Sequence, residues 1–249
     1  MNIPEDVLNM FLKSFQNMGG QFHILENHVP VEQQLEYLNY SRKMRKRKYK
    51  IKEGDYHLYR EKLENVELPK EEKKKILTIL ALSSEVHAYR LLEQYMQKPD
   101  EELVHWASMA FMESRIMLES ELSDERLLYI STGLGGKMGK MRFYALIAST
   151  NVTPFVDYQR QVIEKEFGYL MPENDCEIER LSIKDSYIEL VFLIPVTADF
   201  KKILEKVVRE CNIYGNFLSQ TFDASNVKIF NQDEINQILT KKKEKLKKG

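Results

Sequence analysis

The stretch Leu127–Ala148, LLYISTGLGGKMGKMRFYALIA, decides how the rest of the chain is divided. Two apolar runs, Leu127–Ile130 and Met141–Ala148, flank four of the chain's ten glycines, which fall within seven residues. Apolar runs on either side of a glycine-rich break predict two strands joined by a turn or a flexible loop. Upstream of the stretch the apolar residues follow helical spacing, and downstream strand-like and helix-like segments alternate. The sequence therefore predicts a helical first part and a mixed second part.

The clearest helical patterns lie in the middle of the first part. Lys70–Ser83 and Glu85–Gln97 each carry their apolar residues on one stripe. The turn Lys98–Asp100 then leads into a third helix that begins at Glu101. An N-terminal helix is predicted from Pro4 to Gly20 on the same grounds.

A further helix is predicted from Val31, directly after Pro30. Its apolar residues Leu35, Leu38 and Met44 are expected to face inward. The helix runs into a strongly basic segment.

The segment Glu85–Leu118 resembles a HEAT repeat. Its Pro–Asp turn and the run Val104, Ala107, Ala110 look like parts of one helix pair, and Lys70–Ser83 looks like the second helix of the preceding repeat. A self-sufficient solenoid usually needs three copies, and no third copy is found, so a generic helical bundle stays an alternative. The resemblance implies a surface that binds another protein, and it implies no chemistry.

The second part is predicted to follow the order strand, helix, strand, strand, helix, strand. The predicted strands are Met141–Ser149, Glu177–Ile183, Tyr187–Val196 and Val227–Phe230. This order resembles the ferredoxin-like split βαβ arrangement. The predicted fold is therefore α+β with two domains: an all-α HEAT-like domain over residues 1–125 and a ferredoxin-like βαββαβ domain over residues 126–240. A Lys-rich tail follows over residues 241–249.

Two of these strands are apolar on both faces. Strands that are apolar all round are buried on both sides, and leaving such side chains in water would forgo about 2 kcal/mol each. One face of the sheet should be covered by its own two helices. We expect the other face to be covered by the helical domain or by the same sheet of a second copy, which would make a homodimer.

Positive charge is concentrated in two runs, although the net charge is −1. The run over residues 42–52 has eight basic residues and no acid, and Lys241–Lys248 has six lysines and one glutamate. A solvated basic face is one interpretation; contact with phosphates or an acidic partner is the other. The candidate binding residues are Arg42, Lys43, Arg45, Lys46, Arg47, Lys48, Lys50 and Lys52, with Tyr49 available to stack.

The glycine-rich loop is a second candidate site. Its backbone amides together with Lys137 and Lys140 could hold an anion, which makes Gly135, Gly136, Lys137 and Lys140 the candidate residues. The spacing matches neither a P-loop nor a dinucleotide fingerprint, because a strand follows where a helix is needed. A turn or a hinge is the alternative interpretation.

No arrangement of residues predicts catalysis or a metal. All five histidines precede residue 106, no HExxH pattern occurs, and Cys176 and Cys211 lack metal-site spacing. No nucleophile can be matched with a base and an oxyanion site. The sequence predicts no catalytic residue, no metal and no cofactor, and a protein that is not an enzyme.

The predicted location is cytoplasmic, because the N-terminus has acids where a signal peptide needs bases and no apolar run approaches 18 residues. No contact with a membrane is expected. The predicted function is a non-catalytic adaptor or scaffold that binds another protein through its helical domain and dimerises through its sheet. The alternative is an RNA- or ribosome-associated protein that uses the basic segments 42–52 and 241–248.

Overall fold

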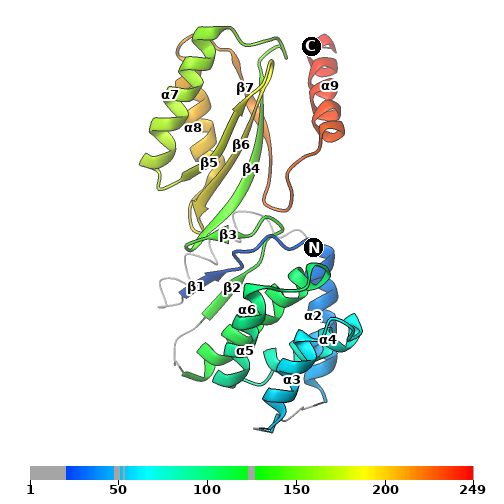
Figure 1. The fold of residues 1–249 in the computed structure, drawn as a ribbon. Coiled ribbons are helices and arrows are strands. Elements are labelled where there is room, and N and C mark those ends of the chain that lie inside the picture. The colour runs from blue at the N-terminus through cyan, green and yellow to red at the C-terminus, as the bar shows by residue number, and fades with distance from the viewer. Residues whose placement is uncertain (1–20, 48–50, 53, 123–126, 249) are drawn as a thin grey trace. The chain divides into compact units, whose positions relative to one another are not determined.

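The computed structural model describes residues 21–47, 51–52, 54–122 and 127–248, and it contains both helices and an antiparallel sheet (Figure 1). The fold is therefore α+β. The described chain divides into two compact units, one ending at Gly133 and the other beginning at Leu134. The helix predicted over Pro4–Gly20 lies outside the described residues, as do Lys48, Tyr49 and Lys50.

The first unit is mainly helical. Its helices are α2 (Val31–Arg45), α3 (Asp55–Glu64), α4 (Lys70–Ala81), α5 (Val86–Gln97) and α6 (Val104–Leu122), with a 3-10 turn over Glu101–Leu103. The apolar stripes of α4, α5 and α6 pack against one another around Leu77, Leu80, Leu92 and Met109, which are all buried. The periodicity of the sequence thus located these three helices well.

A short parallel pair of strands completes the first unit. Strand β1 (Gln21–Ile24) pairs with β2 (Leu127–Ile130), and the Leu25 amide donates to the Ile130 carbonyl at 3.0 Å. The predicted second domain begins at residue 126 and so includes Leu127–Ile130. The structure places the division at Gly133 instead, because the backbone partner of β2 is β1 and not a strand downstream.

The second unit contains one sheet and three helices. Its strands are β3 (Gly136–Lys137), β4 (Lys140–Ser149), β5 (Glu177–Ile183), β6 (Tyr187–Pro195) and β7 (Leu218–Ser225), and its helices are α7 (Asp157–Glu173), α8 (Phe200–Asn212) and α9 (Gln232–Lys248). Across the sheet the order is β5, β6, β4, β7, every neighbour is antiparallel, and β3 forms a hairpin with β4.

The last strand differs from its prediction. Residues 227–230 form no strand, and the strand that pairs with β4 is β7, which begins at Leu218. Strand β7 is mostly polar, so the apolar run Val227–Phe230 was the more strand-like segment in sequence.

Both faces of this sheet are covered within the unit (Figure 1). Helices α7 and α8 pack on one face, against Phe143, Ile188 and Phe192. Helix α9 lies over the other face, where Ile235 packs in a smaller cluster with Tyr144. The expectation that the helical domain or a second copy covers this face is therefore wrong, because the chain supplies its own cover. Residues 241–248 of the predicted Lys-rich tail continue this helix.

Candidate functional site

Helix α2 turns an unexpected side toward the core. Its buried residues are Gln34, Tyr37, Ser41 and Met44. Leu35 is 56% exposed and Leu38 is 44% exposed, so the prediction that both leucines face inward is wrong. Met44 is buried, as the sequence indicated. The helix thus has a mostly polar inner stripe and an outer stripe that contains two leucines.

A single buried carboxylate on α6 explains this orientation. Glu113 accepts hydrogen bonds from the Tyr37 hydroxyl at 2.6 Å and from the Ser41 hydroxyl at 2.7 Å. The Arg45 guanidinium donates to the same carboxylate at 2.8 Å. Because these donors recur every four residues, one stripe of α2 satisfies one buried charge. Burial raises the pKa of Tyr37, and the neighbouring Glu113 carboxylate raises it further.

This orientation directs the basic end of α2, which we define as Arg42, Lys43 and Lys46, into solvent. All three side chains are exposed, and no carboxylate of the described residues forms an ion pair with any of them. Of the other predicted binding residues, Arg45 is bound to Glu113, whereas Arg47 and Lys52 are exposed. The structure therefore separates one structural arginine from a set of solvent-facing cations.

The second basic segment lies on α9 in the other unit. Lys241 and Lys243 are exposed. Lys242 is instead used within the fold, with its Nζ 3.2 Å from Asp223 Oδ2 and 2.9 Å from the carbonyl of Thr221, on the edge strand β7. A lysine at this edge discourages the pairing of further strands.

The glycine-rich loop forms a tight hairpin between β3 and β4. Met138 and Gly139 have φ angles of 48° and 76°, as the central residues of a two-residue hairpin turn require. The Gly135 carbonyl accepts the Arg142 amide at 3.0 Å, and Gly136 pairs with Met141.

Both lysines of this loop are in ion pairs. Lys137 lies 3.3 Å from Glu177 and Lys140 lies 2.7 Å from Asp175. An anion at the loop would therefore compete with these carboxylates, and the anion site remains a prediction.

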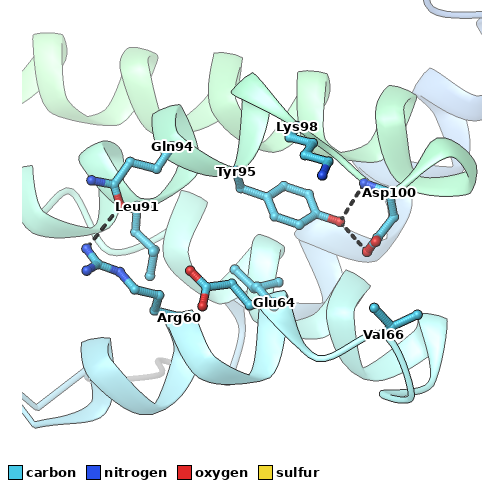
Figure 2. Close-up of a pocket in the computed structure, with 9 residues that line it drawn as sticks. Arg60, Glu64, Val66, Leu91, Gln94, Tyr95, Lys98 and Asp100 are labelled. Carbon is cyan, nitrogen blue, oxygen red and sulfur yellow. Dashed lines mark hydrogen bonds between the residues drawn. The ribbon is translucent and has the colours of Figure 1, made fainter.

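A cavity of about 400 Å³ opens between α3 and α5 in the first unit (Figure 2). Each side of the cavity carries one basic and one acidic residue, Arg60 and Glu64 on α3, and Lys98 and Asp100 after α5, and Leu91 also lines it. The Arg60 guanidinium donates to the Gln94 side chain at 3.0 Å.

One lining residue of the cavity, Asp100, belongs to an ion pair with a buried lysine. Lys73, only 2% exposed, donates to Asp100 Oδ2 at 2.6 Å, and the Tyr95 hydroxyl donates to the same oxygen at 2.7 Å. Burial acts to raise the pKa of Asp100, but the hydrogen bonds from Lys73 and Tyr95 outweigh it and lower that pKa. Burial, reinforced by the bond to Asp100, raises the pKa of Tyr95. Tyr95 therefore stays protonated at neutral pH and is a poor nucleophile.

In the predicted fold Asp100 only ends the turn before the third helix. The structure shows it bound to Lys73, 27 residues away along the chain. No local signal could have revealed this partner, because it depends on how α4 and α5 pack.

The cysteine thiols and the possible metal ligands form no reactive site within the described ranges. Burial raises the pKa of Cys176 to about 11 and that of Cys211 to about 12, so both thiols stay protonated. In these ranges no group of three or more His, Cys, Asp or Glu could hold a metal ion. Of the helices that the structure describes, none is both long and apolar enough to cross a membrane.

The chain is similar to solved structures of transposases. One is a protein of Deinococcus radiodurans R1 assigned as a transposase, with 15% identity, a TM-score of 0.34, and coverage of 43% of this chain and 91% of that one. Another is a REP-associated tyrosine transposase bound to a REP hairpin, with 13% identity, a TM-score of 0.32, and coverage of 47% and 68%. No family model and no curated protein matches the chain. At these scores the likeness assigns neither an activity nor a ligand to this chain.

These neighbours correct several predictions. They are transposases, not HEAT-repeat or ferredoxin-like relatives, so both family resemblances are withdrawn. The predictions of a non-enzyme, of a non-catalytic adaptor and of a protein partner as the main ligand are likewise withdrawn, because the similar structures are transposases. The alternative of an RNA- or ribosome-associated protein is overturned with them.

Proposed function

We propose that this chain binds DNA and that the basic end of α2 contacts the phosphate backbone. The observation that carries the proposal is the exposure of Arg42, Lys43 and Lys46 together, with no ion-pair partner among the described residues. Other lysines of the same unit, such as Lys73 and Lys74, are paired with carboxylates. Unpaired cations on one helix end attract a polyanion, and each phosphate contact releases condensed counterions.

The rigidity of α2 supports the proposal. The Glu113 hydrogen bonds hold the inner stripe, and Tyr37 and Tyr40 pack edge-on against Trp106 at 5.1 and 5.2 Å between ring centroids. A helix fixed in this way presents its charges without a further cost of ordering its backbone on binding. Arg45 is excluded from the contact surface because Glu113 already holds it.

The proposal extends to the organisation of the chain. The helical unit supplies the phosphate contact, and the βαββαβ unit is a separate module with its own basic surface on α9. A cytoplasmic location belongs to the same proposal.

Binding is tested by fluorescence anisotropy of the full chain with a labelled duplex, a hairpin and an RNA of equal length at about 50 mM salt. The hairpin is included because one similar structure is bound to a REP hairpin. The variant Lys43→Gln/Lys46→Gln should weaken DNA binding by about tenfold or more, without dependence on sequence.

The matched control is Lys241→Gln/Lys243→Gln, which removes the same charge from α9. It should bind DNA as the unmodified chain does. If the control loses binding and the α2 variant keeps it, or if only RNA binds, the proposal is wrong.

A further inference from the structure

We propose that α2 pairs with α2 of a second copy in antiparallel fashion, through the outer stripe formed by Glu32, Leu35, Leu38 and Arg42. These residues recur at helical spacing on the side of α2 away from the core. The inference goes beyond DNA binding, and the interface that it names lies wholly on one described helix.

The apolar part of the stripe favours burial. Leu35 and Leu38 are 56% and 44% exposed, while Gln34 and Ser41 occupy inner positions beside Tyr37 and Met44. The inner stripe is thus more polar than that of an ordinary amphipathic helix, and the two exposed leucines offer an apolar surface for contact. In an antiparallel pair Leu35 of one copy meets Leu38 of the other, twice by symmetry.

The charged part of the stripe selects a second copy and its direction. Glu32 lies in the first turn and Arg42 in the last, and neither is in an ion pair among the described residues. Glu36, the other acid of the helix, is already 2.9 Å from Lys74. An antiparallel pair places each Glu32 beside the Arg42 of the other copy. A parallel pair would bring the two basic ends together and repel.

The pair leaves Lys43 and Lys46 of the proposed DNA contact in solvent. Lys43 points to the side of the stripe, and Lys46 lies beyond the end of the partner helix in the antiparallel register. Arg42 would then serve mainly the pairing. Self-association is measured without nucleic acid, and the DNA test changes only Lys43 and Lys46, so either proposal can fail alone.

The test is sedimentation equilibrium of the full chain up to about 200 μM, since an interface of this size belongs to the weak class. We expect a monomer–dimer equilibrium. Leu35→Ala/Leu38→Ala should weaken the dimer by at least about tenfold, because each leucine occurs twice in the interface.

Charge exchange tests the direction of pairing. Glu32→Arg and Arg42→Glu should each weaken the dimer by about tenfold, and the two changes together should restore it to within about threefold of the original. The control Glu67→Arg changes an exposed acid outside the stripe and should have no effect.

Three results would overturn the proposal. The first is a monomer at every concentration. If the leucine variant of that monomer is also less stable, the stripe is covered by the chain's own N-terminal segment and not by a second copy. The second is a dimer that the leucine changes do not weaken. The third is a double charge variant that fails to recover.

Discussion

Lys73 is a buried charged residue that one counter-charge stabilises. Its ammonium group is buried and depends on Asp100, whose own side chain is 41% exposed. Gly139 is a position where the backbone restricts the residue type, because L-residues avoid its φ angle.

Replacing Asp100 with Asn should lower the free energy of unfolding by about 2–3 kcal/mol, because the buried Lys73 loses its counter-charge. Urea unfolding followed by the fluorescence of Trp106, the chain's one tryptophan, measures the change. The matched control is Asp175→Asn, which alters an ion pair whose carboxylate is 75% exposed and should cost less than about 1 kcal/mol. Equal effects in the two variants would show that Asp100 does not balance a buried charge.

The same ion pair predicts how stability depends on pH. The pKa of Asp100 is lowered below its usual 3.8 in the fold, so its stabilisation is complete above that value and is lost as the pH falls through the folded pKa. The unmodified chain should therefore lose more stability than Asp100→Asn between about pH 5 and pH 2. Parallel pH profiles for the two proteins would contradict this assignment.

Replacing Gly139 with Ala should cost about 1–2 kcal/mol, since its φ of +76° is strained for any residue with a Cβ. Gly168 provides the contrast: it lies within α7, and an added Cβ would meet nothing within 4 Å. Gly168→Ala should therefore stabilise by about 0.5–1 kcal/mol. Circular dichroism of thermal unfolding measures both, and effects of the same sign would refute the turn geometry.

At the scale of elements, sequence patterns located helices better than they located the partners of those helices. The stripes of α4, α5 and α8 are apolar and periodic, so their positions and buried faces could be predicted. The inner face of α2 could not be predicted, because it is set by the carboxylate of Glu113, some 72 residues away from Ser41. Strand β7 was missed because an edge strand need not be apolar.

The cover of the second sheet face is the other element that the sequence concealed. The lysines of α9 resembled a solvated tail, and the apolar residues that anchor it, Ile235, Ile238 and Leu239, are few. Of the candidate site, the basic residues could be predicted from composition, but not which of them the fold uses internally. That distinction depends on Glu113 and Asp223, whose positions only the tertiary structure fixes.

Ile235→Ala should destabilise the second unit by about 2–3 kcal/mol, because it removes a side chain that is 2% exposed in the contact between α9 and the sheet. Ile229→Ala, at a position 42% exposed before the helix, should cost less than about 1 kcal/mol. Chemical unfolding followed by circular dichroism compares them. Similar losses would mean that α9 does not seal this face.

At the scale of the whole molecule, the chain consists of two units that can be observed separately. Trp106 belongs to the first unit, so its fluorescence reports on that unit alone. Ile235→Ala should shift unfolding measured by circular dichroism and leave the Trp106 transition in place. If both transitions move together, the two units unfold as one cooperative body.

The most direct test of DNA binding through the basic end of α2 is the slope of log affinity against log salt concentration for the full chain. Each phosphate contact contributes about 0.9 to that slope. We predict that Lys43→Gln/Lys46→Gln reduces the slope by about 2, while Lys241→Gln/Lys243→Gln leaves it unchanged. An identical slope for the unmodified chain and the α2 variant would contradict the account.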